Sequence, residues 1–243
     1  MTALLALTSI KHAPGVTTAA LALALAAGPQ PISLVVEADP AGGDLAARAE
    51  LTVEPGLGSL AASARHGAPV DLVPHLQPLP AGPYGVLAPL SSRLAGAALE
   101  ALGDRLTTAL GAWDGTVVVD CGRWQPDGPA AGLLKAADAL LVVLRPTVEG
   151  VEHVRAHLDE LTMTGPSAVA ALLVGDRPYT PAEVAAGLGI PVVGALPYDP
   201  KAVRGLERRV IGAEVRRSPL VRAARSALDV MSRWELSRAE VWA

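Results

Sequence analysis

The chain has 243 residues, of which 51% are hydrophobic, and its formal net charge is −4. This length allows a large core, and we expect a single domain over residues 1–243. The sequence contains no phenylalanine, so alanine, valine and leucine must build that core. The one cysteine, Cys121, excludes an intrachain disulfide framework and is expected to be a small core residue.

Charge is distributed unevenly along the chain. Residues 1–200 hold 10 basic and 19 acidic side chains, whereas residues 201–243 hold 10 basic and 5 acidic ones, so the net charges are −9 and +5. The N-terminal apolar run has no basic region before it and is interrupted by Lys11 and Pro14, which is not typical of a secretory signal. No stretch approaches the ~18 uninterrupted apolar residues of a membrane span, so we expect a cytoplasmic protein.

Short apolar runs alternate with helix-like segments along the chain. The runs are rich in valine and leucine and apolar at consecutive positions, which is typical of strands buried on both faces of a parallel sheet. This order predicts an α/β fold with a doubly wound, mostly parallel sheet flanked by helices. The expected strands are 3–8, 32–38, 84–90, 116–121, 139–146, 168–174 and 191–197. The expected helices are 17–27, 44–50, 93–112, 129–137, 148–162, 180–188 and 201–212.

Two further segments lie outside this alternation. The proline- and glycine-rich stretch 66–83 is predicted to be an insertion loop near the mouth of the site. A last helix begins near Ser218, a good N-cap, with Pro219 in its first turn. Its apolar stripe is expected to pack on the sheet's outer helical layer, the alternative being peripheral contact with a membrane. The stripe consists of Leu220, Ala224, Leu228 and Met231.

Three loops with ligand-binding residue types follow the expected strands, and open α/β sheets bind ligands beyond the carboxyl ends of their strands. The stretch SIKHAPGVTT (9–18) places glycine and threonine at a helix start, where backbone N–H groups can bind phosphate. The other two are EADPAGGD (37–44) and the end of VVVDCG (117–122). A threonine hydroxyl together with a strand-end aspartate can hold Mg²⁺.

This ordered set resembles the MinD/ParA family of deviant-Walker P-loop ATPases, which position cell-division sites, chromosomes, plasmids, pili and flagella. The family loop reads K-G-G-x-G-K-T-T, and KHAPGVTT aligns with it without a gap. The resemblance covers most of residues 1–212 and implies a P-loop NTPase-like fold of three α/β/α layers.

The resemblance implies roles for the aligned loop residues. Lys11 matches the family's extra lysine, which reaches the partner's phosphates in the nucleotide-sandwich dimer, so it is a candidate for catalysis and for nucleotide binding. Gly15 matches the last glycine of the loop, Thr17 the Mg²⁺-binding hydroxyl and Thr18 the threonine after it. A homodimer is therefore expected.

Residues on later strands also match the family's site. Asp39 takes the place of the aspartate tied to hydrolysis, so it is a candidate catalytic residue. Asp120 matches the metal-linked Walker B carboxylate, and Pro197 lies in the loop near the base, where it is a candidate nucleotide contact.

The departures from the family pattern are as informative as the matches. Val16 stands at the Walker lysine, Glu37 replaces the first aspartate of D-x-D-P, and Gly175 stands where the family usually has a base-recognising asparagine. From these changes we expect binding of ATP and Mg²⁺ to be weakened or lost, and the chain to be a pseudo-ATPase. The loop itself also carries His12 and Ala13 in place of two glycines, and Pro14, which lacks an N–H donor.

Two other groups of residues have competing interpretations. His153 and His157 lie four residues apart on an expected helix near Glu149, which favours a solvated face over a metal pair because no third ligand with suitable spacing is visible. The basic C-terminal residues are either a solvated face or a contact for DNA phosphates. They are Arg204, Arg208, Arg209, Arg216 and Arg217.

Three functional hypotheses follow from these residues. The leading one is a positioning or scaffolding protein, for cell division, chromosomes or pilus and secretion systems, that acts through protein partners. The first alternative is an active but slow ATPase of the same family with Mg-ATP-driven dimerisation. The second is a metabolic or metallocentre-maturation enzyme on the same fold.

Overall fold

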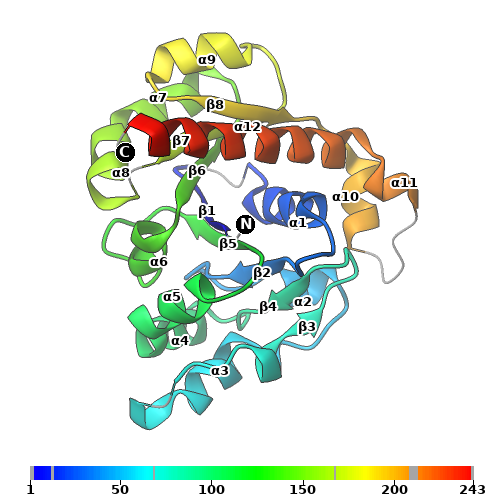
Figure 1. The fold of residues 1–243 in the computed structure, drawn as a ribbon, viewed down its shortest axis with the longest axis vertical. Coiled ribbons are helices and arrows are strands. Elements are labelled where there is room, and N and C mark those ends of the chain that lie inside the picture. The colour runs from blue at the N-terminus through cyan, green and yellow to red at the C-terminus, as the bar shows by residue number, and fades with distance from the viewer. Residues whose placement is uncertain (1–2, 12–13, 68, 167, 208–212, 242–243) are drawn as a thin grey trace.

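Residues 3–11, 14–67, 69–166, 168–207 and 213–241 are described by a computed structural model of the chain. Within these residues, eight strands form one sheet in the order β3-β4-β2-β5-β1-β6-β7-β8 (Figure 1). Neighbouring strands run parallel except for the edge strand β3, which is antiparallel to β4. The strands are β1 (Ala3–Ser9), β2 (Leu34–Glu37), β3 (Gln77–Pro78), β4 (Tyr84–Val86), β5 (Thr116–Arg123), β6 (Ala139–Leu144), β7 (Val169–Val174) and β8 (Val192–Leu196).

Helices cover both faces of the sheet. One core cluster joins the sheet to α1, α2, α10, α11 and α12, and the other joins it to α3 through α9. The inner strands are continuously apolar because both of their faces are buried, as the parallel pattern predicts. The helices are α1 (Val16–Ala27), α2 (Leu45–Arg48), α3 (Leu57–Ser63), α4 (Ser92–Leu102), α5 (Asp104–Gly111), α6 (Ala131–Ala136), α7 (Val148–Ala156), α8 (Leu158–Thr164), α9 (Pro181–Leu188), α10 (Pro200–Leu206), α11 (Ala213–Arg216) and α12 (Pro219–Val241).

The C-terminal helix α12 packs on the protein itself. Its side chains Leu220, Ala224 and Met231 are buried, and Leu228 packs against the same cluster. The helix contacts α1 and β8, alongside which it runs in Figure 1. The expected packing of the stripe is therefore confirmed. Among the described residues, no helix is both long and apolar enough to cross a membrane.

Three segments differ from the sequence-based expectation. The helix expected over 93–112 is divided at Gly103, whose N–H closes α4 on the carbonyl of Leu99. The helix expected over 148–162 is divided at His157, whose ring packs edge-on against Trp124 with centroids 5.7 Å apart. The described part of the stretch 66–83 includes the 3₁₀ turn η2 (Val73–His75) and the strand β3, which pairs with β4 at the sheet edge.

Candidate functional site

The sheet order brings the three candidate loops together. Strand β5 lies between β2 and β1, and Glu37 at the end of β2 is in register with Asp120 of β5, which is in register with Leu7 of β1. The loop before α1, the 37–44 segment and the end of β5 therefore meet at the carboxyl edge of the sheet, where the sequence predicts a site.

The loop after β1 retains the geometry of a helix N-terminus. Gly15 precedes α1 with φ 105° and ψ 39°, a left-handed conformation that favours glycine. Its carbonyl accepts the N–H of Ala19 at 2.8 Å, and the N-cap residue, as a glycine, provides no side-chain cap. The first-turn N–H groups of α1 thus keep the donor character that anion sites use.

Val16 is buried in the core. Its side chain is 6% exposed and belongs to the same apolar cluster as Leu7 and Leu141, which lie on the strands beneath α1. An isopropyl group in this position offers no charge to an anion at the helix N-terminus. The position aligned with the family's Walker lysine is therefore used for packing.

The buried Asp120 pairs with the half-buried Thr17. The Thr17 hydroxyl hydrogen-bonds the Asp120 side chain, and the N–H of Gly122 donates to Asp120 Oδ1 at 3.0 Å. Burial raises the pKa of Asp120 to about 6, opposed by these two hydrogen bonds and reinforced by the negative charges of Asp39 and Asp44. A hydroxyl and a carboxylate in contact are oxygen donors of the kind that Mg²⁺ accepts.

Glu37 links the 37–44 segment to the end of β4. Its Oε1 accepts the N–H groups of Asp44 at 2.7 Å and Leu45 at 2.8 Å, and its Oε2 accepts the N–H of Ala88 at 3.0 Å. Burial raises the pKa of this carboxyl to about 7, although all three hydrogen bonds lower it. Three backbone N–H groups donate to the two carboxyl oxygens of Glu37, so this residue has a structural role. The sequence comparison, in which Glu37 stands at the first aspartate of the family motif, does not reveal that role.

Asp39 accepts hydrogen bonds from backbone N–H groups of its own loop. Its Oδ1 accepts the N–H of Ala41 at 2.8 Å, and its backbone carbonyl accepts the N–H of Gly42 at 3.0 Å. The carboxyl lies directly against Gly122, where a Cβ atom would come within 2.0 Å of Asp39 Oδ2. Burial raises the pKa of Asp39, and the Arg123 charge lowers it.

Thr18 belongs to a network that the sequence does not reveal. Its Oγ1 accepts a hydrogen bond from Nη2 of Arg48 at 2.9 Å. The Nε of the same arginine donates a hydrogen bond to Glu207 Oε1 at 2.7 Å. Arg48 and Glu207 are 159 positions apart, so no local pattern could have indicated this contact. The network joins α1 to α2 and to the residue that ends α10.

Lys11 and Pro197 line two different cavities. Lys11 is exposed and borders a cavity of about 410 Å³ together with Arg145 and His153. Pro197 borders a cavity of about 780 Å³ between α10 and the start of α12. Their roles in nucleotide binding therefore stay predictions.

The remaining candidates are placed as follows. His157 Nδ1 lies 2.8 Å from the carbonyl oxygen of His153, and among the described residues no group of three or more His, Cys, Asp and Glu could hold a metal ion. Cys121 is buried, as expected, and burial raises the pKa of its thiol. The positions His12, Ala13, Arg208 and Arg209 lie outside the described residues.

The fold is that of the MinD/ParA ATPases, which confirms the resemblance at the level of structure. Septum-site determining protein MinD from Pyrococcus horikoshii OT3, solved with Mg-ADP, is similar with a TM-score of 0.75 and 18% identity over 97% of this chain and 99% of that chain. A ParA family ATPase from Chlorobium tepidum TLS has a TM-score of 0.73 and 20% identity over 93% and 98%. The MinC:MinD complex from Aquifex aeolicus contains a chain with a TM-score of 0.68 and 16% identity over 94% and 95%. Neither protein-family models nor curated proteins match the sequence.

Proposed function

We propose that this chain is a MinD/ParA-like positioning or scaffolding protein that acts mainly through protein–protein contacts. Its nucleotide site has lost efficient ATP hydrolysis. The observation that carries this proposal is the burial of Val16 in the core at the Walker lysine position.

The energetic cost of this change is large. A hydrogen bond to a charged group contributes about 1.5–3 kcal/mol, so losing one lysine–phosphate contact lowers affinity roughly 10- to 150-fold. The loss is greater in the transition state, where charge develops on the transferring phosphoryl group. The side chain of Thr18 also accepts a hydrogen bond from Arg48, which orients its hydroxyl within the protein.

The donor set fits Mg-ATP only in part. Thr17 and Asp120 are the residues that would hold Mg²⁺, which would supply charge neutralisation to a bound phosphate. The N-cap Gly15 also makes no side-chain hydrogen bond to the first turn of α1. These observations favour one second candidate, a slow ATPase that keeps Mg-nucleotide binding.

Protein partners and a homodimer are part of the proposal. MinD in the Aquifex aeolicus structure is in complex with MinC, and that fold is shared by this chain. Lys11 is exposed and free to face a second copy. Within the described part of the basic segment, Arg204, Arg216 and Arg217 are exposed, so contact with DNA phosphates stays a further possibility to test.

Calorimetric titration with Mg-ATP and Mg-ADP tests the proposal. We expect the unmodified chain to bind neither at micromolar concentration and the Val16→Lys variant to bind measurably tighter. Val16→Met is the matched control, because it lengthens the side chain without adding charge. Micromolar binding with turnover by the unmodified chain would instead establish the slow ATPase, and this result does not depend on how well Val16→Lys folds.

A further inference from the structure

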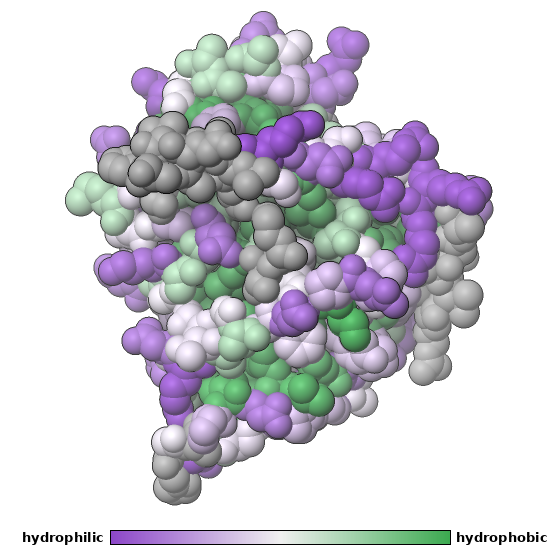
Figure 2. All heavy atoms as spheres, viewed as in Figure 1, coloured by the Kyte–Doolittle hydropathy of each residue, from purple (hydrophilic) through white to green (hydrophobic). Residues whose placement is uncertain are grey.

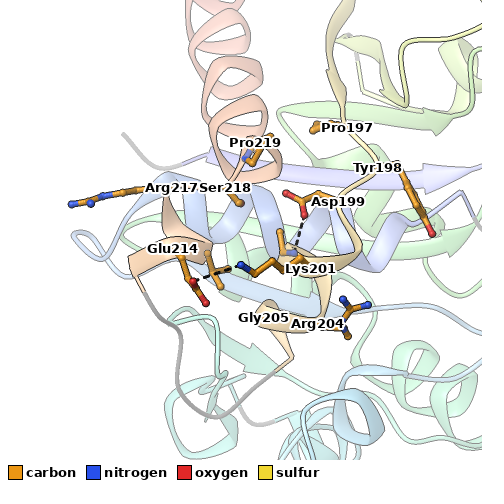
Figure 3. Close-up of a pocket in the computed structure, with 12 residues that line it drawn as sticks. Pro197, Tyr198, Asp199, Lys201, Arg204, Gly205, Glu214, Arg217, Ser218 and Pro219 are labelled. Atoms are coloured by element: carbon orange, nitrogen blue, oxygen red, sulfur yellow. Dashed lines mark hydrogen bonds and ion pairs between the residues drawn. The ribbon is translucent and has the colours of Figure 1, made fainter.

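A second concave feature, bordered by Pro197, lies on the protein away from the Val16 position. It has a volume of about 780 Å³ and lies between α10, α11 and the first turn of α12 (Figure 3). Its lining includes the apolar residues Ala202, Val215 and Pro219. This size is within the range of about 300–1,000 Å³ found for ligand sites, so the cavity can admit side chains of a partner segment.

Two arginines without ion pairs border this cavity. Arg204 and Arg217 are exposed, and neither has an acidic partner within the described residues. In Figure 3, Arg217 extends outward at one end and Arg204 lies toward the other. Such cations remain available to an incoming carboxylate.

A third cation is held only weakly. Lys201 Nζ lies 3.8 Å from Glu214 Oε2, and the two side chains are 82% and 72% exposed. Exposed pairs of this kind contribute little, so a ligand carboxylate can exchange with Glu214. Asp199, the other acidic residue of the lining, caps the N-terminus of α10, because its Oδ1 accepts the N–H of Ala202 at 3.0 Å.

The surroundings reinforce the positive charge. Hydrophilic side chains gather over α11 and the first turns of α12 (Figure 2), where Arg216 and Arg222 are exposed. The whole segment 201–243 carries a net charge of +5, against −9 for residues 1–200. An acidic partner is therefore attracted to this part of the surface and repelled by the rest.

We propose that this cavity is the docking site for an acidic, partly apolar peptide segment of a partner protein. Carboxylates of the segment pair with Arg204, Arg217 and Lys201, while an apolar side chain between them rests on Val215 and Pro219. The inference rests on the proposed function in that both assign protein contacts to this chain. The cavity shares Pro197, a candidate nucleotide contact, with the nucleotide site, so its test is carried out without nucleotide.

A peptide fits these observations better than duplex DNA. The cations border a concavity with an apolar lining, which suits a segment that combines carboxylates with an apolar side chain. A duplex is a wide rod that meets proteins through exposed cationic surfaces and cannot enter such a cavity. The two classes of ligand are distinguished by competition, because a peptide seated in the cavity is displaced by duplex DNA only if the DNA uses the same cations.

Fluorescence anisotropy with the full chain and no nucleotide tests this site. The probe is a fluorescein-labelled peptide of alternating glutamate and leucine, and its lysine–leucine counterpart is the control peptide. We expect the acidic peptide alone to bind, Arg204→Glu or Arg217→Glu to weaken binding about three- to tenfold, and Glu214→Gln to strengthen it about two- to fivefold. Arg93→Glu, an equal charge change at an exposed residue of α4, is the matched control and is expected to leave binding unchanged.

Three results would overturn this inference. They are equal binding of the two peptides, equal effects of Arg204→Glu and Arg93→Glu, and an unchanged affinity in Glu214→Gln. Salt-sensitive retention of duplex DNA that competes with the peptide would assign the arginines to nucleic acid instead. Because no nucleotide is present, failure here leaves the Val16 titration intact, and failure of that titration leaves this test intact.

Discussion

The carboxyl of Asp39 lies directly against the backbone of Gly122, where a Cβ atom would come within 2.0 Å of Asp39 Oδ2. Gly122 also has φ 59°, a left-handed conformation, and its carbonyl accepts the Thr8 hydroxyl at 3.1 Å. The 37–44 segment is thus placed by contact with the end of β5, next to the buried Asp120. The loop after β2 and the end of β5 therefore pack directly against each other through Asp39 and Gly122.

Gly122→Ala is predicted to destabilise the fold by about 2–4 kcal/mol, because it adds both a steric collision and an unfavourable backbone conformation. Urea unfolding measures this change. Combining it with Asp39→Ala removes the collision and leaves the backbone strain, so the double variant is expected to lose less than the sum of the two single changes. Strict additivity of the two changes would contradict the described contact.

The raised pKa of Glu37 predicts a pH dependence of stability. The carboxyl keeps its proton to about pH 7 in the folded chain but loses it near its ordinary value of 4.5 when unfolded. The folded state therefore binds more protons between these values, and the contribution of Glu37 to stability falls as pH rises through this window, by about 3 kcal/mol in total.

Glu37→Gln isolates this effect. The amide cannot titrate, so the stability of the unmodified chain relative to the variant is expected to decrease from pH 5 to pH 7.5. The variant also leaves the N–H of Ala88 facing an amide N–H₂, which costs about 1–3 kcal/mol at every pH. Urea unfolding across this pH range separates the pH-independent cost of the unpaired N–H from the pH-dependent contribution of the Glu37 carboxyl. A free-energy difference between the two proteins that does not change with pH would refute the raised pKa of Glu37.

The Arg48–Glu207 pair is predicted to contribute more than an ordinary surface ion pair. Both side chains are 25% exposed, and Arg48 also donates to Thr18. A double-mutant cycle with Arg48→Ala and Glu207→Ala is expected to give a coupling free energy of about 1 kcal/mol or more. The Arg155–Glu152 pair, which is 60% and 53% exposed, provides the matched control, and its coupling is expected to be smaller. Equal couplings would contradict a structural role for Arg48.

Met231→Ala distinguishes a packed C-terminal helix from a membrane-binding one. Met231 is 2% exposed, so its truncation is expected to cost about 2–4 kcal/mol of unfolding free energy without changing sedimentation with anionic vesicles. Ser226→Ala, at an exposed position of the same helix, is the control and is expected to have little effect. Loss of vesicle binding with unchanged stability would favour the membrane alternative.

Local patterns predicted most of the architecture. Consecutive apolar residues indicated strands buried on both faces, and their alternation with helices indicated the parallel sheet, because these properties depend only on neighbouring residues. The same patterns could not place the breaks at Gly103 and His157. The second of these coincides with a tertiary contact to Trp124.

For the site, the sequence by itself determined which residues stand at the start of the first helix, Val16 and Thr17, and which stand at or after strand ends, Asp39 and Asp120, since their order follows from the strand–loop–helix pattern. Only the tertiary structure decided what those residues do. The burial of Val16, the three backbone donors on Glu37 and the Arg48–Glu207 pair across 159 positions all depend on which elements pack together in space. Packing and desolvation are properties of the assembled layers, and no single stretch of sequence contains them.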